Sequence, residues 1–196
     1  KNIPITPGIS SPSDMEQAIE MGLDAVKFFP AVPSGGLSMI KALAAPYHTM
    51  RFMPTGGVTP QNLTEFLDYP KILACGGTWM VKPELLATGN FEEITRLTRQ
   101  TVRTMLDLKI DELTLPFPHT GNNLSDALHG LINLSSGSTK ELTISCRYLK
   151  RTIYHLEKNG ATFRYDNAKY DSAGNMDAID FSDAPEDFSI HLLEKR

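Results

Sequence analysis

The strongest constraint on the fold is a pattern that repeats through the first half of the sequence. Short apolar runs that end in proline or glycine alternate with stretches of helical apolar spacing, and the runs recur at a spacing of a little over 20 residues. The four runs span residues 4–8, 25–30, 51–57 and 72–77. Strands and helices in alternation are typical of parallel βα units.

The stretches between these runs predict helices. Ser13 can cap a first helix, and a second is predicted around residues 39–44. Thr59-Pro60 predicts the start of a third, because proline is tolerated at the first helical position. A fourth is predicted over residues 91–105, where apolar side chains recur at helical spacing.

A complete (β/α)₈ TIM barrel takes about 250 residues, and only four βα units fit here before the composition changes. Residues 1–106 are therefore predicted to form the second half of such a barrel. A half-barrel leaves two unpaired parallel edges, so we expect that the chain is a fragment or that another copy completes it. The start at Lys1, without methionine, leads to the expectation that a segment is missing upstream.

Residues 107–196 predict a separate, small α+β domain in the order βαβββ. Strands are expected at 113–115, 141–146, 161–165, 176–181 and 188–193, with helices over 124–134 and from about 149 to Gly160. Residues 171–175 are expected to close a hairpin between two of the strands. The first 106 residues are neutral, so this second half carries the whole net charge of −4.

Composition excludes several classes of function. With 19 basic and 23 acidic residues the chain has no basic footprint for nucleic acid, and no apolar run approaches the roughly 20 residues of a membrane span. Two cysteines, Cys75 and Cys146, do not make a disulfide framework. We therefore expect a cytoplasmic protein without nucleic-acid or membrane partners.

Lys27 is the most informative residue, because it stands within the apolar run Ala25–Pro30. Burial disfavours the charged form of an amine, and a neutral amine can attack a ketone to form a Schiff base. The protonated imine then acts as an electron sink for breaking an adjacent carbon–carbon bond. The alternative is a lysine at a strand end that reaches solvent or pairs with an acid.

Two double-glycine turns add to this picture. Gly56-Gly57 follows Thr55 at the end of the third run, and Gly76-Gly77 ends the fourth run and precedes Thr78. Glycine lets backbone N–H groups approach an anion closely, and a neighbouring hydroxyl adds a donor. Glycine after a strand is also ordinary turn chemistry, so each pair by itself is weak evidence.

Several motifs together resemble one enzyme family in order and spacing, over about residues 2–105. They are Ile5–Ser10, Gly22–Ala31, Ser34–Gly36, Arg51–Val58 and Leu73–Val81. The family is that of the 2-keto-3-deoxy-6-phosphogluconate (KDPG) and 2-keto-4-hydroxyglutarate (KHG) aldolases, which are carbon–carbon lyases of the class I type. The resemblance implies a keto-acid substrate, no cofactor, no metal, and a homo-oligomer that is a trimer.

The resemblance also implies roles for individual residues. Lys27 would be the Schiff-base lysine, Thr55 would contact the pyruvyl part of the substrate, and Phe29 and Pro7 would line the pocket. The phosphate or distal carboxylate would bind to Gly56, Gly57, Gly76, Gly77 and Thr78. Trp79 is interpreted as packing at the barrel rim.

The chain departs from the family pattern in two respects. Thr78 stands where the family usually has serine, which keeps the hydroxyl. The general acid/base glutamate and the carboxylate-binding arginine of the family lie on an earlier strand, which we expect to belong to the missing upstream segment. Glu16 and Glu20 lie on a predicted helix and do not substitute, so the chain as given is expected to be inactive or nearly so.

Alternatives remain open at this point. The chain could be a non-catalytic fragment that acts through its tail domain, or a sister aldolase for 2-keto-3-deoxy-6-phosphogalactonate. The tail loosely resembles half of a glyoxalase-like (vicinal oxygen chelate) module, with oligomer contact or regulation as its favoured role. It carries His119, His129, His155 and His191, but their spacing predicts no metal site.

Overall fold

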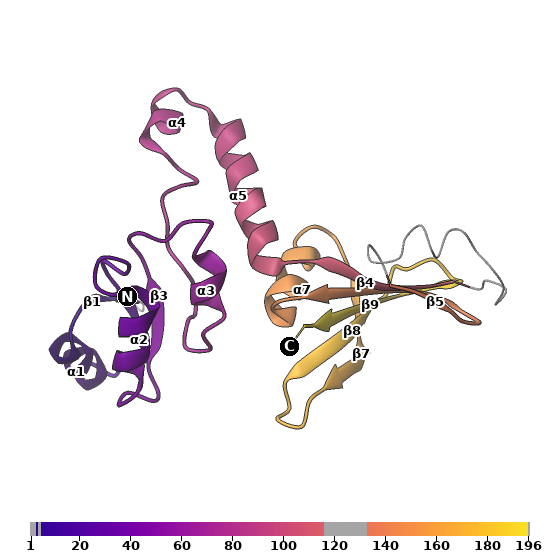
Figure 1. Ribbon diagram of the computed structural model, residues 1–196, viewed down its shortest axis with the longest axis horizontal. Coiled ribbons are helices and arrows are strands. Elements are labelled where there is room, and N and C mark those ends of the chain that lie inside the picture. The colour runs from indigo at the N-terminus through magenta and orange to yellow at the C-terminus, as the bar shows by residue number, and fades with distance from the viewer. Residues whose placement is uncertain (1–2, 4, 116–132, 196) are drawn as a thin grey trace. The chain divides into compact units, whose positions relative to one another are not determined.

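The computed structural model describes residue 3 and residues 5–115 and 133–195. The chain divides into two compact units, Lys1–Met105 and Leu106–Arg196, each with its own sheet (Figure 1). We call them unit 1 and unit 2. His119, His129 and most of the helix predicted over 124–134 lie outside the described residues.

Unit 1 alternates strands and helices along the chain. Its elements are β1 (Gly8–Ile9), α1 (Pro12–Glu20), β2 (Ala25–Phe28), α2 (Gly36–Ala44), β3 (Arg51–Pro54), α3 (Leu63–Leu67), α4 (Pro83–Ala87) and α5 (Phe91–Leu106). The three strands pair in the order β1-β2-β3, and both pairs are parallel. The predicted α/β alternation is therefore confirmed over this stretch.

The fourth predicted strand is reduced to two isolated bridges beside β3. Ile72 pairs with Phe52, and Gly76 pairs with Thr55, both in parallel. A continuous ladder does not form between them, because the pairing register shifts by one residue from the first bridge to the second. The bridges still bring Gly76 and Gly77 next to the end of β3.

The two faces of the sheet in unit 1 differ in character. Val26, Phe28 and Phe52 are fully buried on one face, while Lys27 and Met53 alternate with them on the other. Helices complete the core with side chains that are almost entirely buried: Met15, Ala18, Ile40, Leu43, Ala44, Leu63, Phe66 and Leu67. Burial of a large apolar side chain contributes about 1.5–3 kcal/mol, so this face stabilises the unit and leaves the other face for chemistry.

Two helices begin at other residues than the sequence predicts. The cap of α1 is Ser11 and not Ser13: the Ser11 hydroxyl accepts from Asp14 N, and the Asp14 carboxylate accepts from Ser11 N, which makes a capping box. The third helix begins at Leu63 and not at Pro60, because Asn62 Oδ1 accepts from Thr59 N and residues 60–62 form a turn.

The remaining helices of unit 1 lie towards its end. The sequence did not predict the short helix α4. The bounds of α5 agree to within one residue with those of the helix predicted over residues 91–105. Among the described residues, no helix combines the length and the apolar character that crossing a membrane requires.

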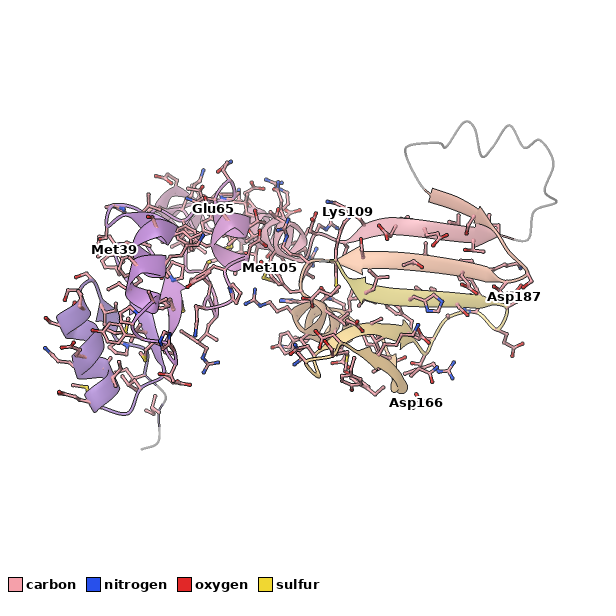
Figure 2. The ribbon with its side chains drawn as sticks, turned by 60° about the horizontal axis from the view of Figure 1, so that its bottom comes forward. Met39, Glu65, Met105, Lys109, Asp166 and Asp187 are labelled. Carbon is pink, nitrogen blue, oxygen red and sulfur yellow. The ribbon has the colours of Figure 1, made fainter. Side chains whose placement is uncertain are left out.

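Unit 2 is built on one six-stranded sheet. Its elements are β4 (Lys109–Leu115), β5 (Asn133–Ser136), β6 (Lys140–Cys146), α7 (Leu149–Glu157), β7 (Phe163–Tyr170), β8 (Met176–Phe181) and β9 (Phe188–Glu194). The strand order is β5-β4-β6-β9-β8-β7, and the segment from β6 to β9 follows the βαβββ order. Figure 2 shows these strands with their side chains, from Lys109 in β4 to Asp187 before β9.

The core of unit 2 lies between α7 and the sheet. It consists of buried side chains from the helix and four of the strands: Cys146, Leu149, Ile153, Phe163, Ile179 and Leu192. The hairpin predicted at residues 171–175 is present, because the Asp171 carboxylate accepts from Ala173 N and Asn175 N. Asn133 and Leu134 were predicted in a helix, but they begin β5, which pairs with β4 and gains a Thr114–Ser135 hydroxyl contact of 2.6 Å.

Candidate active site

Lys27 lies in the middle of the sheet in unit 1. It is flanked by Gly8 of β1 and Met53 of β3, and its N–H donates to Pro7 O at 2.8 Å. Its side chain is half-buried on the face opposite Val26 and Phe28. A Cβ on Gly8 would meet nothing within 4 Å, so the space beside the lysine is open.

Phe29 links Lys27 to the first glycine turn. The Lys27 ammonium lies 4.8 Å from the centre of the Phe29 ring, which is a cation–π distance. The same ring lies against Gly56, where a Cβ would come within 3.2 Å of it. Gly56 and Gly57 both have positive φ, 93° and 82°, so this turn requires glycine.

Thr55 links the first glycine turn to the second. Thr55 N donates to Phe28 O at 3.0 Å, and Gly76 N donates to Pro54 O at 2.9 Å. A Cβ on Gly76 would lie 2.6 Å from Thr55 Oγ1, so only glycine lets the Thr55 hydroxyl approach this backbone. The predicted residues Phe29, Thr55, Gly56 and Gly76 are thus brought together beside Lys27.

The second glycine turn presents backbone donors. Among the described residues, no acceptor is bonded to the N–H of Gly77 or Thr78, whereas Gly76 N is used by the sheet. The Thr78 side chain is exposed. Successive N–H groups without an acceptor, with a hydroxyl beside them, are the kind of donors that phosphates and carboxylates bind in proteins. All these groups lie at the carboxyl ends of parallel strands, where barrels place their sites.

Comparison with known proteins identifies this arrangement. Residues 1–97 match the aldolase family described as KDPG and KHG aldolase. The first half of this chain belongs to the KDPG and KHG aldolase family. The resemblance found in the sequence is thereby confirmed, and we call residues 1–97 the aldolase segment.

Two similar proteins show the extent of the match. A 2-dehydro-3-deoxy-phosphogluconate aldolase of Haemophilus influenzae is 50% identical over 101 residues, which are 52% of this chain and 48% of that protein. The KHG/KDPG aldolase of Escherichia coli K12 is 40% identical over 100 residues, 51% of this chain and 47% of that protein. The chain therefore spans about half the length of the curated relatives it matches.

A solved structure shares the fold of the aldolase segment. The KDPG aldolase of Legionella pneumophila, with pyruvate captured as a covalent carbinolamine intermediate, is 36% identical with a TM-score of 0.50. The match covers 52% of this chain and 49% of that chain. Both the relatives and this structure place the aldolase segment in a lyase family.

The acidic side chains beside the aldolase sheet are engaged elsewhere. Glu16 accepts from the Tyr47 hydroxyl at 3.0 Å, which raises the pKa of Tyr47. Asp24, just before β2, pairs at 2.5 Å with Arg51, the first residue of β3, and hence at the opposite end from the glycine turns. Across the residues that the structure describes, no carboxylate forms an ion pair with Lys27.

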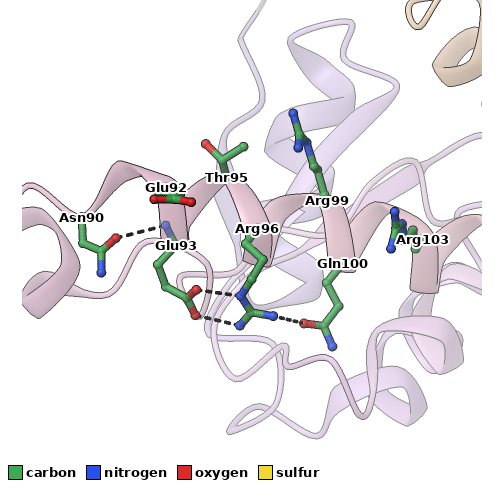
Figure 3. A pocket seen from close by; sticks show the side chains of 8 residues that line it. All are labelled: Asn90, Glu92, Glu93, Thr95, Arg96, Arg99, Gln100 and Arg103. Atoms are coloured by element: carbon green, nitrogen blue, oxygen red, sulfur yellow. Dashed lines mark hydrogen bonds and ion pairs between the residues drawn. The ribbon is translucent and has the colours of Figure 1, made fainter.

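A hollow along α5 lies outside this site (Figure 3). It is lined by Asn90, Glu92, Glu93, Thr95, Arg96, Arg99, Gln100 and Arg103. Arg96 donates to both oxygens of Glu93 at 2.7 Å, and this pairing lowers the pKa of Glu93. Because all the lining residues come from one helix and the residue before it, we interpret this hollow as a hydrated charged helix face.

Unit 2 carries its own polar cluster on the sheet. His191 Nδ1 lies 2.7 Å from Asp180 Oδ1, and His191 Nε2 lies 4.0 Å from Glu141 Oε2. Burial raises the pKa of Asp180, but hydrogen bonds from His191 and Asn167 outweigh it and keep this pKa below its usual value. Within the described residues, no group of three or more His, Cys, Asp or Glu side chains is arranged to hold a metal.

Two contacts of the aldolase site were missed by sequence reasoning. The Trp79 ring lies directly on Gly77, where a Cβ would come within 1.6 Å of it, and Trp79 Nε1 donates to Thr101 Oγ1 of α5 at 3.1 Å. The sequence predicted that Trp79 packs at the barrel rim, but it predicted neither the contact with Gly77 nor the hydrogen bond to Thr101. A bulky aromatic residue two positions after a glycine is a signal for the first contact, but only the fold brings Thr101 to Trp79.

Proposed function

We propose that the aldolase segment serves a pyruvate-forming class I aldolase in which Lys27 forms the Schiff base. The observation that carries this proposal is the position of Lys27 on the open face of the sheet, beside Phe29 and Thr55 and near two glycine turns. In the second of these turns the N–H groups of Gly77 and Thr78 have no acceptor among the described residues. The substrate class is a 2-keto acid with a distal anionic group, either KDPG or KHG.

The proposed reaction begins at the ketone. Lys27 Nζ adds to C2 of the substrate and water leaves, which forms a protonated imine. A base removes the proton of the C4 hydroxyl, the C3–C4 bond breaks, and its electrons pass into an enamine of pyruvate. The leaving aldehyde is glyceraldehyde 3-phosphate from KDPG or glyoxylate from KHG. Protonation of C3 and hydrolysis of the imine then release pyruvate and restore Lys27.

The other residues take the roles that the family resemblance implies. The Thr55 hydroxyl faces the pyruvyl portion, and the Phe29 ring and Pro7 form the wall beside it. The N–H groups of Gly56, Gly57, Gly77 and Thr78, together with the Thr78 hydroxyl, bind the distal phosphate or carboxylate, because an anion is stabilised by several convergent donors. The role predicted for Gly76 is confined to its missing side chain, since its N–H already donates to Pro54 O. This division places the reacting carbon and the anion at opposite ends of one site.

Proton transfer limits what this polypeptide does by itself. No carboxylate is paired with Lys27 among the described residues, and a positioned acid/base group contributes about 10²–10⁴-fold to the rate. We therefore expect the 196-residue polypeptide to form the imine and to cleave KDPG at least about 10²-fold more slowly than a complete aldolase. Measurement of pyruvate release from KDPG, KHG and 2-keto-3-deoxy-6-phosphogalactonate determines the preferred substrate.

Assembly of several copies is a further part of the proposal. Among the described residues, β1 pairs with β2 only, so its other edge has no strand beside it. Open parallel edges favour association, and we propose a homo-oligomer, a trimer by the family resemblance. Light scattering after size-exclusion chromatography measures this directly, and a monomer would contradict it.

Borohydride trapping tests the proposed chemistry. Incubation with pyruvate and sodium borohydride should reduce the imine and attach a stable adduct at Lys27, located by peptide mass mapping. Lys27→Met should abolish the adduct, because the methionine side chain has no amine. Lys41→Met, at an exposed lysine of α2, is the matched control and should label normally. Absence of an adduct in the wild-type chain would favour a non-catalytic role for this polypeptide.

A further inference from the structure

Trp79 occupies an unusual position beside the second glycine turn. Its six-membered ring lies so close to Gly77 that a Cβ at that position would come within 1.6 Å. The ring thereby covers the backbone of the residue whose N–H, with that of Thr78, has no acceptor among the described residues. The orientation of those two donors depends on what holds the ring in place.

Thr101 holds the Trp79 ring from α5. The Thr101 hydroxyl donates its proton to Leu97 O at 2.9 Å, so its lone pairs remain available to an outside donor. Trp79 Nε1–H fills that position at 3.1 Å. The indole is therefore held at one side by close contact with Gly77 and at the other by its hydrogen bond to Thr101.

We propose that Trp79 is a positioning residue that keeps the Gly77 and Thr78 N–H groups aimed at the substrate's anion, and that Thr101 keeps Trp79 in place. Trp79 does not touch the reacting carbon, so its role is to preorganise donors before the anion arrives. This inference rests on the proposed function only in assigning an anion to the second glycine turn.

The chain offers a direct probe, because Trp79 is its only tryptophan. Titration with inorganic phosphate, against sodium chloride at equal ionic strength, should change Trp79 fluorescence and give a dissociation constant. In Thr101→Val we expect this constant to rise about three- to tenfold, as expected for one lost hydrogen bond. Thr101→Ser keeps the acceptor and should restore wild-type affinity.

Thr98→Val is the matched control on the same helix. The Thr98 hydroxyl donates to Ile94 O at 2.8 Å, like that of Thr101 to Leu97 O, but it is exposed and accepts nothing from Trp79. The Thr98→Val variant should therefore bind phosphate with the affinity of the wild type. If Thr101→Val does not fold, Trp79→Phe keeps the ring and removes the donor, and calorimetric titration with phosphate should show the same weakening.

The outcomes separate this inference from the proposed function. Pyruvate trapping at Lys27 should be unchanged in Thr101→Val, because imine formation does not use the anion site. Equal phosphate affinities in wild type and Thr101→Val, or no phosphate binding by the wild type, would overturn the positioning role even with normal trapping. Loss of trapping in every variant, with the phosphate effect intact, would overturn the proposed chemistry alone.

Discussion

At the scale of single residues, glycine is required at position 57 for two separate reasons. Its φ of 82° lies in the left-handed region, and a Cβ would lie 2.5 Å from the Cβ of Val32. Gly22 has a similar φ of 76° but nothing within 4 Å of the added atom. Substitution at Gly22 therefore measures backbone strain alone, whereas substitution at Gly57 measures backbone strain together with a steric clash.

Substitution of these two glycines by alanine should have unequal effects. Gly22→Ala should cost about 1–2 kcal/mol in free energy of unfolding, which is the cost of the left-handed conformation alone. Gly57→Ala should cost more than Gly22→Ala, because Val32 must also move. Urea unfolding followed by Trp79 fluorescence measures both, and equal costs would show that Val32 yields without penalty.

Asp180 should make unit 2 sensitive to acid. Its pKa lies below the ordinary 3.8, so the charged form is favoured in the folded state. This stabilisation is present above pH 3.8 and is lost as the pH falls through the lower, folded-state pKa. Asp180→Asn should therefore be less stable than the wild type near pH 7, by about 1 kcal/mol, and the difference should shrink below pH 4.

Hydrogen exchange of peptides from β8 and β9 measures this difference locally. Asp166→Asn, at an exposed position of β7, removes a carboxylate that does not contact His191 and serves as the control. A difference between Asp180→Asn and the wild type that stays constant from pH 7 to pH 2 would show that the charge of Asp180 contributes nothing.

At the scale of elements, the start of α1 depends on a reciprocal pair of hydrogen bonds. Ser11→Ala should destabilise unit 1 by about 1 kcal/mol, because it leaves Asp14 N without its acceptor. Ser13→Ala should change stability by no more than a few tenths of a kcal/mol, since alanine is a better helix former than serine inside a helix. Thermal unfolding of both variants decides between the two serines, and a larger effect at Ser13 would contradict the structure.

At the scale of the whole molecule, each unit has its own core, and we expect two unfolding transitions. Trp79 reports on unit 1. Cys146 reports on unit 2, where it is buried and where burial raises the pKa of its thiol, so it should react only after that unit opens. In a Cys75→Ser background, the urea midpoints from Trp79 fluorescence and from Cys146 labelling should differ. Coincident midpoints with a common slope would indicate one cooperative unit.

Much of the local structure was predictable because it depends on neighbours in sequence. The run around Lys27 alternates buried and half-buried side chains, as a strand with one covered face must. The hairpin at residues 171–175 follows from the ability of Asp171 to bond its own turn. The helix start at Pro60 was wrong for the same kind of reason, since Asn62 bonds back to Thr59 and delays the helix to Leu63.

The sequence by itself determined the family, the strand that carries Lys27 and the glycine turns, because periodicity, turn chemistry and motif spacing are properties of neighbouring residues. Only the tertiary structure decided that Thr55 lies against Gly76. It also decided that Trp79 contacts both Gly77 and Thr101, which follows Trp79 by 22 residues. Such contacts between distant residues arise when strands align in register and a helix returns to them, and no local pattern encodes that meeting.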